Sequence, residues 1–181
     1  HEAYPGHHAH YVAMDRELFR KRGWSEYGVG IDSDPLVPVA EAIAEHGVSL
    51  AFPIEERIAF ERDVLYPILG RKMQNEEQWR AFFAARPALL GSTATIARDF
   101  IENRIDEETA VQRLIRYRLQ TPEAARQTVK MLKAFGAYLI ASDFGWYAVD
   151  RAMKKRNLGE QWRLLKRMQR EPMLLADILK L

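Results

Sequence analysis

The chain has 181 residues, of which 48% are hydrophobic and 29% charged, as in an ordinary globular domain with one sizeable core. The 27 basic and 25 acidic side chains nearly cancel, so net charge gives no argument for binding nucleic acid or a membrane surface. No window approaches the ~18 uninterrupted apolar residues of a membrane span. Because the chain has no cysteine, any transition metal must be held by His, Asp or Glu.

The first residue is a histidine inside a histidine-rich motif. We therefore expect residues 1–181 to be a single helical domain that is a fragment of a longer protein. No secretory signal pattern is present, and we expect a soluble protein, with the cytoplasm as the favoured compartment. The sequence does not indicate an oligomeric state.

Apolar residues recur with the helical period of 3.6, and no run shows the strict alternation of a half-buried strand. We therefore predict an all-α fold of about eight or nine helices. In chain order, the N-terminal half is expected to contain a first helix that closes near Gly23, a loop from Trp24 to Pro38, a second helix from Pro38 to Pro53, a third that runs towards Pro67 and Gly70, and a fourth from Asn75 that ends at Pro87.

Capping signals mark the C-terminal half. Asp106, followed by two glutamates, is typical of an N-cap with acidic residues in the first turn. Thr121 before a proline gives the same signal. The helix that Thr121 opens is predicted to run to about Arg156, and two glycines within it indicate close packing or a bend. These glycines are Gly136 and Gly145. We also predict a helix after the Gly91-Ser92 break and two short helices on either side of Pro172.

The first ten residues, HEAYPGHHAH, hold most of the histidines. A peptidase zinc site usually takes two histidines four apart on a helix, with a glutamate beside the first as general base. Here the fourth position after His1 is Pro5, and the next histidines are His7 and His8. On an unbroken helix, His7 would point about 120° away from His1 and His8 would lie roughly 10 Å further along the axis, so neither could share a metal with His1.

Pro5 rules out an unbroken helix, because its ring clashes with the carbonyl four residues back and it has no N–H to donate. Gly6 permits backbone angles that are closed to other residues. We therefore predict a bulge at Pro5-Gly6 that absorbs the two extra residues and brings His7 to the same metal as His1.

HEAYPGHH resembles the motif HE-x-x-PG-HH of the bacterial proteins grouped as domain of unknown function 885, which are zincin-like metallopeptidases. Relatives of those proteins carry a glutamate ligand on a later helix, in an E-G-x-A type motif, and this chain offers AEAIAEHGVSLAF. The resemblance implies that the chain is the C-terminal half of a zincin-like peptidase. It further implies that His1, His7 and Glu45 bind zinc and that Glu2 is the general base.

The third ligand has an alternative. His46 lies between Glu45 and Gly47, where the family motif has glutamate directly before glycine. Glu41, one turn earlier on the same helix face, is therefore the other candidate ligand. His46 itself could hydrogen-bond a ligand or a substrate, although packing is the simpler role for it.

The remaining histidines also leave alternatives open. His8 is the alternative to His7 as a ligand, and a His7/His10 pair three residues apart is the main rival geometry. Otherwise we expect His8 and His10 to lie on the surface or to support the ligands from behind.

Two further features are candidate parts of the site. Tyr138 lies in AYLIASDFGWYAV, which loosely resembles a tyrosine-containing helix of the family, and could donate its hydroxyl to a developing oxyanion as a catalytic residue. Arg116 and Arg118 could anchor a substrate carboxylate through bidentate contacts. The alternative roles are core packing for the tyrosine and a solvated helix face for the arginines.

The sequence therefore predicts a zinc-dependent metallopeptidase that hydrolyses a peptide or a small related amide with Glu2 as general base. The basic runs RELFRKR, MKKR and RLLKRMQR alternate with apolar residues at helical spacing, which is typical of solvated amphipathic faces rather than of a nucleic-acid interface. The alternative function is a non-catalytic or degenerate metal-binding helical domain that acts through protein contacts.

Overall fold

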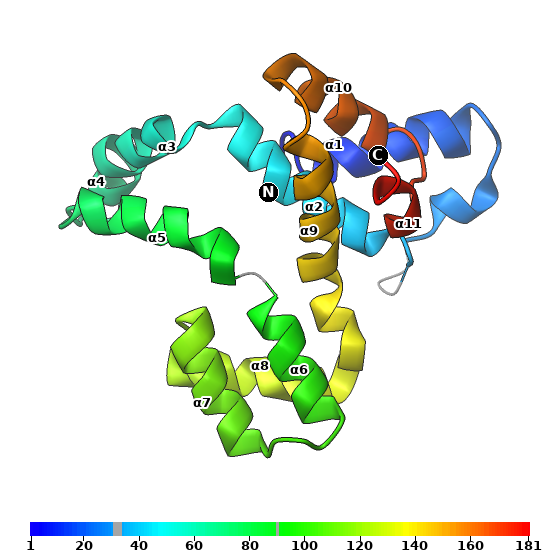
Figure 1. The fold of residues 1–181 in the computed structure, drawn as a ribbon. Helices are drawn as coiled ribbons and strands as arrows, with labels where there is room; N and C mark the ends of the chain where they lie inside the picture. Colours follow the sequence, from blue (N-terminus) through cyan, green and yellow to red (C-terminus); the bar gives the residue numbers. More distant parts are fainter. Residues whose placement is uncertain (31–33, 90) are drawn as a thin grey trace.

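The computed structural model describes residues 1–30, 34–89 and 91–181, and over these residues it contains helices and no strand (Figure 1). The predicted all-α class is therefore confirmed. The α-helices are α1 (His7–Met14), α2 (Val37–Ala51), α3 (Ile54–Phe60), α4 (Tyr66–Ile68), α5 (Glu76–Leu89), α6 (Ser92–Ile101), α7 (Glu107–Arg118), α8 (Pro122–Phe135), α9 (Ala141–Met153), α10 (Leu158–Met168) and α11 (Leu175–Ile178). The described chain also contains four shorter helical segments. Two are π-helical, η1 (Asp15–Arg20) and η3 (Glu61–Leu65), and two are 3-10 helical, η2 (Ser25–Gly28) and η4 (Gly136–Ile140).

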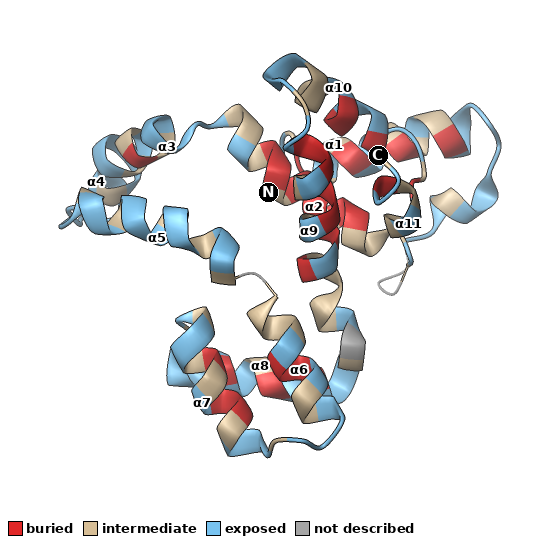
Figure 2. Cartoon of the chain, in the orientation of Figure 1, coloured by how far each residue is buried: buried red, intermediate tan, exposed pale blue. Residues whose placement is uncertain are grey.

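The main core lies where α2 packs along α9, with α10 and α11 against them (Figure 2). Gly145 permits the close approach of α9 to α2, because a Cβ at this position would lie 1.7 Å from the carbonyl oxygen of Pro38. The close packing predicted for this glycine is therefore confirmed. The side chains that fill this core are fully buried and aliphatic, and they include Ile43, Val149, Leu165 and Met168.

A second cluster of buried residues lies among α6, α7 and α8, at the bottom of Figures 1 and 2. It is formed by Ile96, Val111, Leu114 and Val129. The predicted caps start two of its helices: the Asp106 side chain accepts a hydrogen bond from the N–H of Thr109 at 2.8 Å, and Thr121 accepts one from Ala124 at 3.2 Å.

Helices α3, α4 and α5 form an arm that extends away from the main core on the left of Figure 1. Ile58 is the one buried residue between residues 54 and 89. Ion pairs join the two sides of the arm: Arg80 contacts Glu55 at 2.8 Å and Arg62 contacts Glu76 at 2.9 Å. The rings of Trp79, Phe82 and Phe83 also contact one another, so the arm combines partly exposed ion pairs with partly exposed aromatic contacts.

Two predicted helix boundaries are wrong. α5 does not end at Pro87 but continues to Leu89, because a proline in the last turn removes only one helical hydrogen bond; Gly91, the next described residue, has a φ of 88°. The helix that Thr121 opens ends at Phe135 rather than near Arg156, because Gly136 adopts a φ of 56° and the chain continues in η4 before α9 begins.

The N-terminal third follows the prediction more closely. α1 and η1 form the first helix, which ends before Gly23, and α2 begins with Pro38 in its first turn. Between them, η2 is a short helical turn inside the segment 24–38 predicted as a loop. Positions 31–33 of that loop lie outside the described residues.

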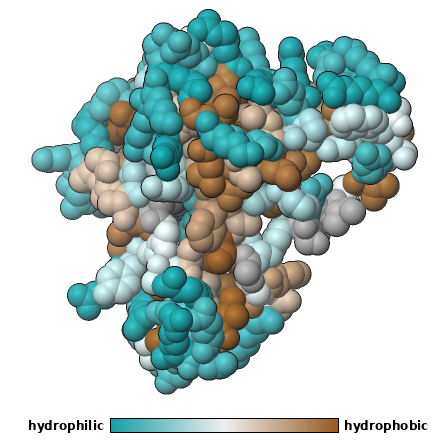
Figure 3. Space-filling model, turned by 45° about the vertical axis from the view of Figure 1, so that its right-hand side comes forward, coloured by the Kyte–Doolittle hydropathy of each residue, from teal (hydrophilic) through white to brown (hydrophobic). Residues whose placement is uncertain are grey.

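In the space-filling view, hydrophobic side chains gather in a band down the middle of the molecule, with hydrophilic surface on both sides (Figure 3). No helix within the described ranges combines the length and the apolar character that crossing a membrane requires.

Candidate metal centre

The predicted bulge is present between Glu2 and His7. The N–H of His7 donates to the carbonyl oxygen of His1 at 2.9 Å, and the N–H of His8 donates to that of Glu2 at 2.9 Å. These hydrogen bonds span six residues where an α-helix spans four. The ordinary spacing returns with His10, whose N–H donates to Gly6 at 3.0 Å. The two extra residues are thus set aside from the helical ladder, and His7 follows His1 as if one turn separated them.

Two glycines make this arrangement sterically possible. A Cβ at Gly6 would lie 1.6 Å from the carbonyl oxygen of His1, and one at Gly47 of α2 would lie 2.8 Å from the Pro5 ring. The carbonyl oxygen of Pro5 accepts a hydrogen bond from the Gln169 side chain at 2.5 Å. The bulge is therefore held between α2 and the end of α10, which sets the motif over α2.

His1, His7 and Glu41 bring their donor atoms together. The two Nε2 atoms of His1 and His7 lie 3.2 Å apart. Glu41 Oε2 lies 3.6 Å from His1 Nε2, and Glu41 Oε1 lies 3.3 Å from His7 Nε2. Among the described residues, this is the group whose ligand atoms all lie within 4.8 Å of one another and could hold a metal ion.

These distances can be compared with those that zinc requires. Four ligands at bond lengths of about 2.0–2.1 Å form a tetrahedron whose edges are about 3.3–3.4 Å. The two Nε2 atoms, 3.2 Å apart, are close to such an edge, and each of them faces a different oxygen of Glu41, at 3.6 and 3.3 Å. Two imidazoles and one carboxylate are also a donor set that zinc takes in hydrolytic sites. The three residues therefore fit a zinc ion.

Glu45 lies on the other side of the His1 ring. Its Oε1 is 3.5 Å from His1 Nδ1, and both of its oxygens lie 3.1 Å from Nη2 of Arg86 on α5. Since His1 turns Nε2 towards His7 and Glu41, Glu45 faces the ring nitrogen that a metal ligand usually gives to a carboxylate. Glu45 as third ligand stays a prediction, and the donor group contains the alternative, Glu41.

Acidic groups crowd this site. Burial raises the pKa of Glu41, and the neighbouring Glu2 and Glu45 raise it further against the opposing effect of His7. Glu2 itself has a side chain that is 85% exposed, with Oε1 3.9 Å from His1 Nε2. The excess of negative charge favours a bound cation.

The other histidines of the motif lie outside the donor group. His8 is exposed and packs edge-on against Tyr4. His10 is buried, which excludes the surface alternative for it and leaves the supporting position behind the ligands, and burial together with the neighbouring His7 lowers its pKa from 6.5 to about 4. It is thus held neutral beneath the site.

His46 points away from the donor group. Its ring stacks on Trp146 of α9 with centroids 5.4 Å apart, and its Nε2 lies 3.4 Å from the Trp146 carbonyl oxygen. Burial lowers the pKa of His46, although the Trp146 hydrogen bond opposes this shift. His46 therefore packs between α2 and α9, which is the simpler of the two roles expected for it.

Tyr138 lies in η4, where its ring is 6.5 Å from that of Phe135. Among the described residues it belongs neither to the donor group nor to the wall of a pocket that adjoins this group. Its catalytic role stays a prediction. Of the two arginines, Arg116 lies over the ring of Tyr117 at 5.5 Å, whereas Arg118 lines the pocket.

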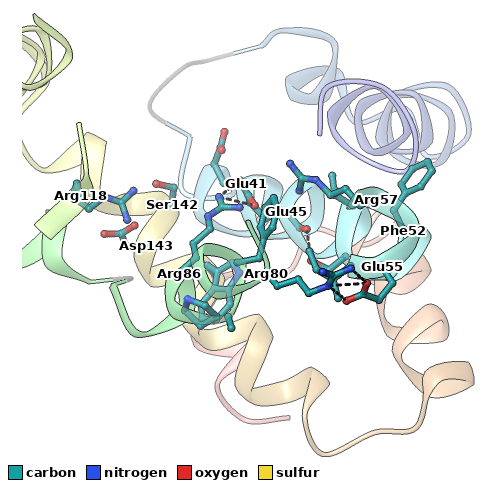
Figure 4. A pocket seen from close by; sticks show the side chains of 17 residues that line it. Glu41, Glu45, Phe52, Glu55, Arg57, Arg80, Arg86, Arg118, Ser142 and Asp143 are labelled. Atoms are coloured by element: carbon teal, nitrogen blue, oxygen red, sulfur yellow. Dashed lines mark hydrogen bonds and ion pairs between the residues drawn. The ribbon is translucent and has the colours of Figure 1, made fainter. Parts of the chain in front are cut away.

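That pocket, of about 660 Å³, begins at Glu41 and Glu45 (Figure 4). Sequence reasoning did not identify it, because α2, the arm, α7 and α9 all contribute to its wall. Arg86 was missed for the same reason, since nothing in the sequence connects it with Glu45. The apolar part of the wall consists of Val48, Phe52, Ile54, Phe83, Ala84, Pro87 and Trp146.

Comparison of the chain with protein-family models, curated proteins and solved structures gave no match.

Proposed function

We propose that this chain carries the metal-binding part of a zinc-dependent hydrolase that cleaves a peptide or a related amide bond. His1, His7 and Glu41 are the proposed ligands, and Glu2 is the proposed general base. The observation that carries the proposal is the convergence of two imidazoles and one carboxylate, with the two Nε2 atoms 3.2 Å apart and all three ligand atoms within 4.8 Å of one another. The resemblance of HEAYPGHH to the zincin-like motif supports the same choice.

Zinc, when bound, would polarise the substrate carbonyl and make a water molecule more acidic. Glu2 follows the first ligand directly, and its exposed carboxylate can accept a proton from water and return it to the departing amine. Its negative charge also lies within 3.9 Å of His1, close enough to act at the same centre.

Glu45 and Arg86 would set the orientation of His1. Glu45 Oε1, 3.5 Å from Nδ1 of His1, is placed to accept a hydrogen bond from an Nδ1–H, which would select the tautomer that offers Nε2 to a metal. Arg86 contacts both oxygens of Glu45 and fixes the position of its carboxylate. This assignment gives each of the two candidate glutamates on α2 a separate role.

The test begins with zinc content, measured on full-length protein from which any tag has been removed. We expect one zinc per chain in wild type and in Glu2→Gln, with hydrolysis of a mixed peptide library reduced at least ~100-fold in the variant. Glu26→Gln, which changes an exposed glutamate outside the site, is the matched control.

Wild-type protein without zinc would contradict the proposal. Zinc in both proteins with equal activity, or with none, would favour the alternative of a metal-binding domain that acts through protein contacts.

A further inference from the structure

The charged side chains on the pocket wall are mostly paired. The pairs are Glu45 with Arg86, Glu55 with Arg80, and Arg57 with Glu61. Glu41 belongs to the donor group. One carboxylate and one guanidinium remain on the wall, Asp143 and Arg118, and neither has a hydrogen bond or an ion pair with any described residue.

Asp143 is a costly residue to leave unpaired. It is only 9% exposed, and its Oδ2 is buried without a partner among the described residues. A buried carboxylate of this kind is strongly unfavourable unless a donor or a cation meets it. Its position in the first turn of α9 supplies no hydrogen bond to Oδ2. The side chain therefore calls for a cationic partner from outside the fold.

Arg118 is the last residue of α7 and is half-buried. Figure 4 shows it at the same end of the pocket as Asp143 and Ser142. A guanidinium without a carboxylate partner is suited to bidentate binding of a carboxylate. One wall thus presents a free negative group and a free positive group.

We propose that this end of the pocket binds a zwitterion, with an ammonium group on Asp143 and a carboxylate on Arg118. A neutral zwitterion satisfies both side chains at once and leaves the charge balance of the pocket unchanged. Ser142 adds a hydroxyl that can bond either group. The inference rests on the proposed function, for which it names the substrate class: a short amide that carries both a free ammonium and a free carboxylate.

The rest of the pocket suits such a substrate. Its volume of about 660 Å³ is in the range of small-molecule sites. Phe83 and Trp146 offer apolar surface for a side chain, and Glu41 at the edge of the pocket connects it with the donor group. The zwitterion could be the head of one α-amino acid or the two ends of a dipeptide, and these two sources can be separated by experiment.

The experiment is calorimetric binding to full-length protein in chelator, so that no metal can bind the probes. The probes are L-leucine, L-leucyl-L-leucine, N-acetyl-L-leucine, which lacks the ammonium group, and L-leucinamide, which lacks the carboxylate. We expect the two blocked probes to bind at least tenfold more weakly than the better zwitterion. Tighter binding of leucine indicates an amino-acid head, and tighter binding of leucyl-leucine indicates the two ends of a dipeptide.

Variants assign each charge to its residue. Asp143→Asn should weaken the zwitterion at least tenfold and leave N-acetyl-leucine unaffected. Arg118→Gln should weaken the zwitterion equally and leave leucinamide unaffected. Arg126→Gln, which changes an exposed arginine of α8 outside the pocket wall, is the matched control and should change neither. Circular dichroism of each variant verifies that it is folded.

Equal affinity for all probes, absence of binding to any of them, or indifference to both substitutions would overturn the inference. Because these measurements need no metal, zwitterion binding without zinc uptake would overturn the proposed function alone. Zinc-dependent hydrolysis without zwitterion binding would overturn this inference alone.

Discussion

The main-chain N–H of His7 donates to the carbonyl oxygen of His1, 2.9 Å away, across six residues of chain. This hydrogen bond takes the place of the one that spans four residues in an α-helix. It brings the two Nε2 atoms to 3.2 Å, although proline and glycine lie between the two histidines. The geometry of the candidate metal centre therefore depends on the bulge.

Replacing Gly6 with alanine tests that dependence. The added Cβ would lie 1.6 Å from the His1 carbonyl oxygen, so the bulge must open. We expect Gly6→Ala to lower zinc affinity at least tenfold and to reduce the free energy of unfolding by about 2 kcal/mol. Chelator competition and urea denaturation measure the two effects. Gly30→Ala is the control, because a Cβ there meets no atom of the described residues within 4 Å. Equal behaviour of the two variants would contradict the steric argument.

Paired substitutions on α2 separate a ligand from a residue that orients one. Loss of a carboxylate behind a ligating histidine typically weakens metal binding about 10–100-fold, which we expect for Glu45→Gln. Glu41→Gln removes a proposed ligand and should weaken zinc binding further. Competition with a chromophoric chelator gives both constants. If Glu45→Gln has the larger effect, Glu45 is the ligand, as the resemblance to the zincin-like family implies.

The buried His10 makes the metal-free protein sensitive to acid. Because burial and His7 lower its pKa from 6.5 to about 4, the unfolded chain takes up a proton before the folded one. The contribution of neutral His10 to the free energy of unfolding is fully present above pH 6.5. As the pH falls towards 4, this free energy decreases by about 3 kcal/mol in total. In urea titrations across this range, His10→Asn should flatten the decline. The exposed His8→Asn should follow wild type, and an unchanged slope in His10→Asn would contradict the assignment.

Asp143→Asn should raise stability while it weakens ligand binding. The substitution removes a buried charge that has no described partner, so we expect a gain of about 1 kcal/mol in the free energy of unfolding. Asp150→Asn on the same helix is the matched comparison, because Asp150 pairs with Lys154 at 2.7 Å, and it should give no gain. Urea denaturation at neutral pH measures both. A loss of stability in Asp143→Asn would show that the carboxylate has a structural partner.

Local rules predicted the features that depend on neighbouring residues. Pro5 and Gly6 indicated the bulge because a proline excludes the helical hydrogen bond, and the bulge is present. Asp106 and Thr121 indicated helix starts through their side-chain oxygens, and both accept the expected main-chain hydrogen bonds. Gly136 was recognised as a bend or a packing position, but its φ of 56° ends α8 altogether.

Features that join distant segments could not be predicted in the same way. Glu41 and Glu45 lie on one helix face, and their separate surroundings depend on Arg86, which is 41 residues beyond Glu45. Likewise, Asp143 and Arg118 meet one pocket from α9 and α7, and periodicity contains no information about that meeting. The sequence could therefore name the candidate donors but could not assign the role of each one.

The bulge between His1 and His7 also separates residue count from helical register. Without Pro5 and Gly6 the motif would read HEAYHHAH, with two histidines four apart and the glutamate still beside the first. A sequence pattern that counts residues treats these two strings as unrelated. In this chain, however, the His7 N–H donates to the His1 carbonyl oxygen, as it would for two histidines four apart on a regular helix. In this chain Pro5 and Gly6 lengthen the motif without lengthening the turn, and Pro5 lies against Gly47 and accepts a hydrogen bond from Gln169. Metal motifs interrupted by Pro-Gly are therefore better compared by turns than by spacing.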